Sequence, residues 1–228
     1  MDAPGIHGLV PVAGQSPTEL LVIDDRAVDE LAVVLPLTSG GTIRVHESAV
    51  RCAALIHQDP TWVPKEATAM VCHDLASVPS PALPPGLALR PVRRTAADPP
   101  GGVPLTQAVA VAAQANGLDA TATASLETYL RTLPGDPLLF AASDDDGTVR
   151  GTSGSRTFLT DAYVFFVNTD PGWRRRGVGL AMTAAGLQSA AQAGATRACL
   201  DASGPGVPLY LRLGFTAAAQ ITQFSRAR

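Results

Sequence analysis

The apolar positions from Gly86 to Phe224 follow two different spacings along the chain. Alternating apolar and polar residues predict strands, and apolar residues at every third or fourth position predict helices. The segment 162–167 is apolar on both faces, which indicates a central, buried strand. In chain order the pattern β-α-α-β-β-β-α-β-α-β emerges, with strands at 86–92, 137–143, 148–159, 162–167, 196–200 and 215–224, and helices at 104–114, 123–133, 178–193 and 207–213.

The first part of the chain has a less regular pattern and ends at a proline-rich stretch. Its apolar positions predict a small α+β region, with strands and helices at 20–24, 27–35, 47–57 and 68–75. The segment from Ser77 to Gly86 contains four prolines before its glycine, so it cannot continue a helix or a central strand. We therefore expect an N-terminal region at 1–76, a linker or extended crossover at 77–85, and the main domain at 86–228.

Composition and charge narrow the class of protein. Hydrophobic residues make up 46% of the chain and charged residues 16%, which is enough apolar material for a packed core. The formal net charge of -3 argues against a general nucleic-acid binder, because that kind of binding needs a basic surface. No signal-peptide pattern is visible, and the apolar runs are too short for a membrane span. We therefore expect a cytoplasmic protein that binds neither nucleic acid nor membrane.

The cysteines and histidines do not have the spacing of a metal site. The three cysteines are widely separated, at positions 52, 72 and 199, and form no Cys-x-x-Cys pair. Cys72 and His73 are adjacent, and neighbours on a strand point to opposite faces. We therefore predict no metal centre.

The segment from Val167 to Leu180 combines three features that suit a bound diphosphate. A buried strand ends there, a loop rich in arginine and glycine follows, and a helix begins at about Val178. Glycine lets main-chain N–H groups turn toward an anion, and the first turn of a helix offers free N–H groups and the positive end of its dipole. The arginines at 174, 175 and 176 add positive charge beside it.

A dinucleotide-binding fold is the main alternative for this segment. Gly177-Val-Gly179 begins a match to the pattern G-x-G-x-x-G, yet position 182 is methionine. The first glycine also lies ten residues after Val167, whereas that fingerprint needs it at the end of the strand. The spacing therefore disfavours this alternative.

The motif residues of this segment resemble those of the GNAT superfamily of N-acetyltransferases. Arg174-x-x-Gly177-x-Gly179 matches the family's (Q/R)-x-x-G-x-(G/A) motif and follows a buried strand, an Asp170-Pro171 pair and Trp173. Farther along, Tyr210-Leu-Arg-Leu-Gly-Phe215 resembles the family's Y-x-x-x-G-F element. The resemblance covers about 86–224 and implies a mixed, mostly antiparallel central sheet flanked by helices. It does not extend to the N-terminal region.

The resemblance also implies a set of site residues and acetyl-CoA as co-substrate. Tyr210 matches the tyrosine that protonates the departing thiolate, a role that suits a phenol held close to it. A main-chain N–H near Asn168 would polarise the thioester carbonyl. The residues that match the family's cofactor-binding positions are Val167, Asn168, Thr169, Arg174, Arg175, Arg176, Gly177, Val178, Gly179 and Leu180.

The general base is not settled by the sequence. Glu127, on the second expected helix of the main domain, and Asp161, at the start of the central strand, are the two candidates, and an ordered water is a third. The prediction is therefore direct transfer of an acetyl group from acetyl-CoA to a primary amine of a small molecule or peptide. A non-catalytic acyl-CoA sensor or scaffold is the alternative, and the sequence allows a homodimer.

Overall fold

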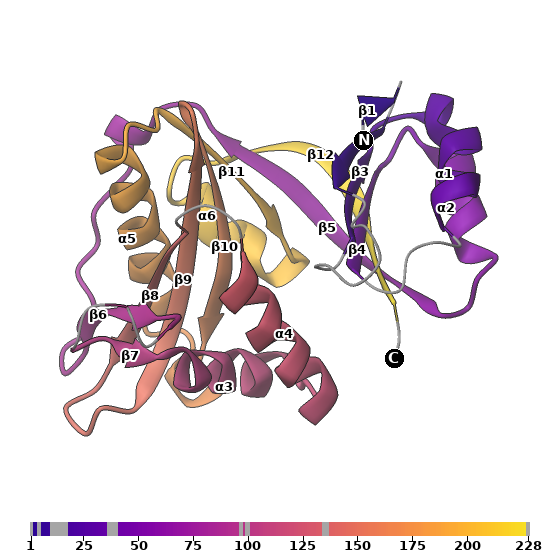
Figure 1. Ribbon diagram of the computed structural model, residues 1–228. Helices are drawn as coiled ribbons and strands as arrows, with labels where there is room; N and C mark the ends of the chain where they lie inside the picture. The colour runs from indigo at the N-terminus through magenta and orange to yellow at the C-terminus, as the bar shows by residue number, and fades with distance from the viewer. Residues whose placement is uncertain are drawn as a thin grey trace. The chain divides into compact units, whose positions relative to one another are not determined.

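The computed structural model describes residues 2–3, 6–9, 18–35, 41–95, 98, 101–133 and 137–226 (Figure 1). The chain divides into two compact units, and the division cuts the chain at several points. Unit 1 comprises 1–69, 201–205 and 217–228, and unit 2 comprises 70–200 and 206–216. The boundary expected at 77–85 lies inside unit 2, close to its start.

Unit 2 is built on a mixed, mostly antiparallel sheet. Its strands follow the order β11-β10-β9-β8-β6-β7, and all neighbours are antiparallel except the β10–β11 and β6–β7 pairs. The predicted fold class is confirmed. The strands are β6 (Ala88–Arg93), β7 (Val103–Pro104), β8 (Leu138–Ser143), β9 (Val149–Phe158), β10 (Asp161–Thr169) and β11 (Arg197–Ala202).

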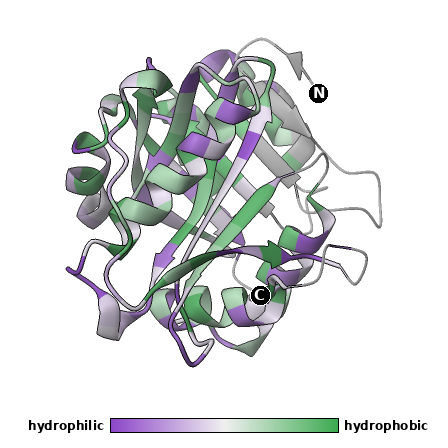
Figure 2. Ribbon diagram, turned by 90° about the vertical axis from the view of Figure 1, so that its left-hand side faces the viewer, coloured by the Kyte–Doolittle hydropathy of each residue, from purple (hydrophilic) through white to green (hydrophobic). Residues whose placement is uncertain are grey.

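Helices cover both faces of this sheet. Strand β8 has apolar side chains on both of its faces, and each face packs against helices. Leu139 and Ala141 pack with α3 (Leu105–Asn116) and α4 (Ala120–Thr132). Their neighbours Phe140 and Ala142 pack with α5 (Val178–Gln192) on the other face. Figure 2 shows apolar segments in green on the strands and helices. The two faces thus form separate cores, and α6 (Val207–Leu211) lies near α5.

The proline-rich stretch is an extended crossover that lies along α5. Leu83 and Leu87 pack against the core between α5 and the sheet. The Gln188 side chain of α5 donates a hydrogen bond to the Ser80 hydroxyl at 2.5 Å. The stretch 77–85 therefore lies within unit 2.

Unit 1 has its own core, between α1 (Val28–Val34), α2 (Val50–His57) and strands of its sheet. Buried side chains such as Leu31, Ile43, Ile56 and Phe224 fill it. The strands follow the order β1-β2-β3-β4-β12-β5. Their bounds are β1 (Asp2–Ala3), β2 (Ile6–Leu9), β3 (Thr18–Val22), β4 (Gly41–His46), β5 (Trp62–Cys72) and β12 (Thr216–Arg226).

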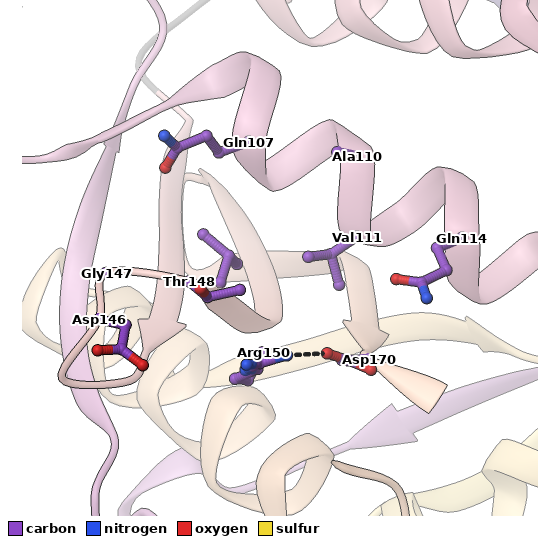
Figure 3. A pocket seen from close by; sticks show the side chains of 10 residues that line it. Gln107, Ala110, Val111, Gln114, Asp146, Gly147, Thr148, Arg150 and Asp170 are labelled. Carbon is purple, nitrogen blue, oxygen red and sulfur yellow. Dashed lines mark hydrogen bonds and ion pairs between the residues drawn. The ribbon is translucent and has the colours of Figure 1, made fainter. Parts of the chain in front are cut away.

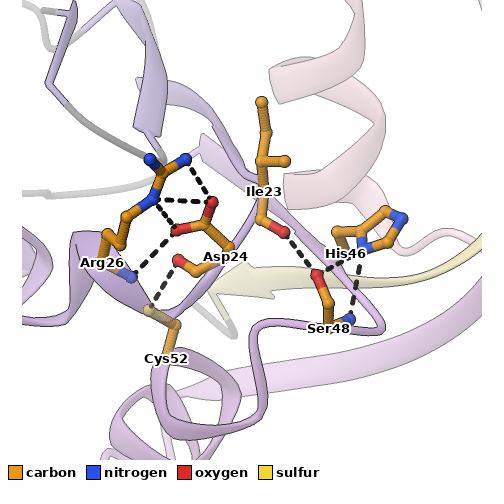
Figure 4. Close-up of polar contacts among 6 residues, drawn as sticks. All are labelled: Ile23, Asp24, Arg26, His46, Ser48 and Cys52. Atoms are coloured by element: carbon orange, nitrogen blue, oxygen red, sulfur yellow. Dashed lines mark hydrogen bonds and ion pairs between the residues drawn. The ribbon is translucent and has the colours of Figure 1, made fainter.

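Short polar contacts connect β3, β4 and α2 in unit 1 (Figure 4). The Ser48 hydroxyl donates to the carbonyl of Ile23 at 2.7 Å, and Arg26 forms an ion pair with Asp24 at 2.6 Å. The Cys52 thiol is buried at the start of α2, and burial raises its pKa to about 11. A thiol held in this way stays protonated and is a poor nucleophile.

Close packing of α5 on β9 depends on glycine. A Cβ atom added to Gly151 would lie 2.5 Å from a methyl group of Val178 and 3.3 Å from the Met182 side chain. A Cβ atom on Gly186 would lie 2.9 Å from the Ser153 hydroxyl. Val178 is buried and β-branched, so it has few rotamers with which to move away. These glycines let α5 approach the sheet, and with it the loop that precedes the helix.

We expect Gly151→Ala to lower the free energy of unfolding by about 1–3 kcal/mol, the usual cost of overpacking a core. Urea denaturation at neutral pH measures this difference. Gly172→Ala is the matched control, because its added methyl group would make only an ordinary contact at 3.5 Å. Equal stability of the two variants would contradict the packing argument.

Candidate active site

The central strand β10 carries a bulge near its end. Its pairing with β9 shifts register between Phe165 and Asn168, and Phe166 has a φ of 57°. On the other side, the register shared with β11 runs from Asp161 to Tyr163, while β10 itself continues to Thr169. Residues 164–169 therefore border an edge where the two parallel strands have separated. Val167, Asn168 and Thr169 are half-buried on this stretch.

The loop after β10 is shaped by two residues with unusual backbone angles. Gly177 caps α5 with a φ of 89°, and Arg175 has a φ of 63°. Non-glycine residues with positive φ are strained and cluster at ligand-binding segments. Val178, Gly179 and Leu180 form the first turn of α5, whose N–H groups lack acceptors within the helix. The arrangement suits a phosphate group, as the sequence predicts.

The three arginines of the loop differ in their surroundings. Arg174 donates a hydrogen bond to the carbonyl of Ala115, near the end of α3, at 2.9 Å. Arg176 lies over the ring of Trp173, with its guanidinium carbon 5.0 Å from the ring centroid. Arg175 is exposed. Part of the expected positive charge therefore has a structural role in holding the loop.

Arg150 links the loop to the β8–β9 hairpin, and sequence reasoning missed it. Its guanidinium pairs with Asp144 at 2.8 Å and with Asp170, the first residue of the loop, at 2.7 Å. It also lies 5.6 Å from the centroid of the Trp173 ring. The pairing with Asp144 lies within the expected hairpin, only six residues away, whereas the pairing with Asp170 joins residues that are twenty positions apart and has no local signal.

A groove of about 560 Å³ lies beside this ion pair (Figure 3). Gln107, Val111 and Gln114 of α3 form one wall, and the Arg150–Asp170 pair lies across from them. The groove borders the residue that opens the loop. Within the described part of the chain, no cluster of three or more His, Cys, Asp or Glu side chains is placed to hold a metal ion.

Tyr210 is buried on α6, close to the start of α5. The neighbouring Leu209 lies 3.0 Å from the Cβ position of Gly179, so α6 lies against the first turn of α5. The Tyr210 ring meets Phe215 edge-on, with 6.0 Å between the ring centroids. Burial raises the pKa of Tyr210 to about 12. The phenol therefore keeps its proton throughout the physiological range.

Both carboxylates predicted as bases are paired with arginines. Glu127 on α4 pairs with Arg131 at 2.5 Å. Asp161 pairs with Arg197 at 2.8 Å and lies at the start of β10. That end is roughly 26 Å from Thr169 at about 3.3 Å per strand residue. The structure thus brings together the bulge and the loop, and places Asp161 at the far end of the strand.

The sequence of this part of the chain and its fold are similar to those of known proteins. Residues 110–215 match the sequence profile of the Acetyltransferase (GNAT) family. This segment is a GNAT acetyltransferase domain. The match begins within α3 and ends after α6, so it includes the bulge, the loop and Tyr210. No curated protein sequence matches the chain.

Solved structures of GNAT proteins are similar to the chain. A GCN5-related N-acetyltransferase from Kribbella flavida has 18% identity and a TM-score of 0.62, over 97% of this chain and 86% of that one. One from Sphaerobacter thermophilus has 16% identity and a TM-score of 0.60, over 97% and 76%. A GNAT-family protein from Novosphingobium aromaticivorans has 18% identity and a TM-score of 0.58, over 87% and 80%. At these identities the likeness establishes the fold. No helix in the described parts of the chain is long and apolar enough to cross a membrane.

We expect Arg150→Gln to lower the melting temperature of the GNAT domain at pH 7. Burial alone would raise the pKa of Asp144, but hydrogen bonds from Arg150 and from the Thr148 N–H outweigh it and lower that pKa. A carboxyl group with a lowered pKa in the native state stabilises the fold when the pH is above the group's ordinary pKa. This stabilisation is lost as the pH falls through the lowered native pKa. The melting temperatures of the variant and the parent should therefore converge as the pH falls from about 4 through the lowered pKa of Asp144.

Thermal unfolding by circular dichroism at pH 7 and pH 3 measures this convergence. Arg197→Gln is the control, because the Arg197–Asp161 pair is about half exposed and such pairs contribute little. A melting temperature of Arg150→Gln equal to that of the parent at pH 7 would show that the bridge is not stabilising.

Proposed function

We propose that the protein is an acetyl-CoA-dependent N-acetyltransferase that acetylates a primary amine of a small molecule or peptide by direct attack in a ternary complex. The observation that carries the proposal is the segment 174–180, which follows the bulged strand β10 after four residues and includes the first turn of α5. The family of residues 110–215 and the N-acetyltransferases of the same fold support it.

The residues present fit the pyrophosphate of acetyl-CoA. Gly177 has its φ in the left-handed region, and a Cβ there would meet nothing within 4 Å, so the cap of α5 faces open space. The N–H groups of Val178, Gly179 and Leu180 would hold the phosphates, with Arg175 and Arg176 adding charge. Acetyl-CoA supplies an activated thioester at this site. Val167, Asn168 and Thr169 would pair with its pantetheine arm through their main chain.

Two groups of this chain would serve the transfer itself. A main-chain N–H at the bulge, near Asn168, donates to the thioester oxygen as negative charge develops on it. Tyr210 gives its phenolic proton to the thiolate that leaves. Since the pKa of Tyr210 is raised to about 12, the acid is fully protonated at working pH. The amine must arrive uncharged to attack.

The base remains a prediction with three candidates. Glu127 is paired with Arg131, and Asp161 is paired with Arg197 at the end of β10 that lies away from the bulge. Water is not held in such a pair, and we therefore favour it as the acceptor of the amine proton. The proposal does not depend on which of the three accepts it.

We expect the purified protein to bind acetyl-CoA saturably, because main-chain N–H groups and a helix dipole recognise its phosphates. Isothermal titration calorimetry measures the affinity. Acetyl-pantetheine, which has the same thioester without the pyrophosphate, is the matched ligand and should bind far more weakly. Equal affinity for the two ligands would show that the loop does not recognise the pyrophosphate. No binding of acetyl-CoA would refute the proposed function.

We expect Tyr210→Phe to lower kcat by about 100-fold, the usual contribution of a general acid, and to leave the Kd for acetyl-CoA unchanged. CoA release with a panel of amines measures kcat. It should be quantified by chromatography, because the exposed Cys199 would react with a thiol reagent. Tyr129→Phe makes the same chemical change on α4 and should keep kcat within about threefold.

Loss of activity only in Tyr210→Phe would support the acid role. Full activity in that variant would contradict it. If the parent protein binds acetyl-CoA but releases no CoA with any amine of the panel, the enzyme proposal is contradicted. The alternative, a non-catalytic acyl-CoA sensor or scaffold, would then be supported.

A further inference from the structure

Two side chains donate hydrogen bonds to the main-chain carbonyl of Phe166 in the bulge, and a third bonds to one of the two. The Thr152 hydroxyl of β9 donates a hydrogen bond to this oxygen at 2.8 Å. The Asn168 side-chain amide donates to the same oxygen and to the Thr152 hydroxyl, both at 3.1 Å. The Asn116 amide, at the end of α3, donates to the Asn168 side-chain oxygen at 2.8 Å. The Thr152 hydroxyl thus donates to the Phe166 carbonyl and accepts from the Asn168 amide.

This network holds a backbone conformation that Phe166 would not adopt unaided. Its φ of 57° lies in the left-handed region, which costs roughly 1 kcal/mol or more for a residue with a side chain. Such a conformation persists only where the surroundings hold it. Thr152 is fully buried, so its hydrogen bond to Phe166 does not compete with water.

The direction of one amide N–H follows from the direction of this carbonyl. The peptide bond is planar and trans, so the carbonyl of Phe166 and the N–H of Val167 point in opposite directions. The carbonyl is held toward Thr152, which belongs to β9. The N–H of Val167 is therefore turned away from the Thr152 hydroxyl, at the stretch of β10 that lies beyond its shared register with β11.

The end of α3 connects this bulge with the loop. Asn116 bonds to the Asn168 side chain, and its neighbour Ala115 accepts the hydrogen bond from Arg174 at 2.9 Å. Asn116 is itself fixed by a bond of 2.8 Å to the carbonyl of Ala112. One helix terminus thus contacts both the bulge and the segment proposed to bind pyrophosphate.

We propose that Thr152, Asn168 and Asn116 are positioning residues that aim the Val167 N–H at the thioester oxygen. None of their side chains needs to touch the substrate, since all three act through the Phe166–Val167 peptide. The inference rests on the proposed function for its catalytic consequence. Its structural part, the direction of one peptide plane, stands independently of activity.

The test compares Thr152→Val, which removes the hydroxyl at nearly constant volume, with Thr152→Ser, which retains it. Thr152→Val should lower kcat by about 10-fold or more, because small displacements of a reacting group cost up to about 100-fold. Its Kd for acetyl-CoA should stay within about twofold of the parent, because the loop is unchanged. Thr152→Ser should recover kcat to within about threefold.

Asn116→Ala provides a second variant for which folding is not at risk, because this residue is exposed at a helix end. It should lower kcat by a few-fold with the same unchanged Kd. Loss of binding and turnover together in Thr152→Val and Asn116→Ala would indicate a merely structural role and overturn the inference. Unchanged kcat in both variants would also overturn it.

A crystal structure of Thr152→Val separates this inference from the proposed function. A rotated Phe166–Val167 peptide, with φ of Phe166 outside the left-handed region, supports positioning by the hydroxyl even if the parent protein transfers no acetyl group. An unrotated peptide overturns positioning even if the parent is a fully active enzyme.

Discussion

The hydrogen bond between the Thr152 hydroxyl and the Phe166 carbonyl is the contact on which the arrangement of this site depends. It joins a buried strand to a strained residue of the next strand and so fixes the point where β10 departs from regular pairing. A regular strand would direct its N–H groups into ladders with its neighbours. The bulge releases one of them at an edge, and chemistry at a carbonyl oxygen needs such a donor.

The position of the loop is fixed by close packing, whereas the bulge is fixed by hydrogen bonds. Gly151 and Gly186 allow α5 to lie against β9, and Val178 packs directly over Gly151. Gly151 is paired with Thr169, the last residue of β10, so the end of the strand and the beginning of the helix are set by the same pair of strands. The loop between Thr169 and Val178 therefore has both of its ends fixed against Gly151. This matters because an anion site made of main-chain N–H groups needs those groups to be held in fixed positions.

The sequence predicted the strand, loop and helix well because each has a local signal. The expected strand at 162–167 is β10 (Asp161–Thr169), and the expected helix at 178–193 is α5 (Val178–Gln192). The bulge had no such signal, since its partners lie on β9 and α3, far away in the chain. The hydrogen bond from Arg174 to the carbonyl of Ala115 in α3 could not be predicted for the same reason. By contrast, β4 (Gly41–His46) was missed although Ile43 and Val45 alternate, with both buried.

The pairing of the acidic residues bears on how the acceptor reaches the thioester. An ammonium group is not a nucleophile, so a site that held it as a cation would have to remove its proton first. Glu127 and Asp161 are each paired with one arginine, whereas Arg150 is shared between Asp144 and Asp170. Glu127 and Asp161 therefore offer an arriving cation little net attraction, while the group of Arg150, Asp144 and Asp170 keeps one negative charge. In the proposed mechanism the amine attacks as its uncharged fraction, and the donor N–H and the Tyr210 acid are the groups proposed to lower the barrier.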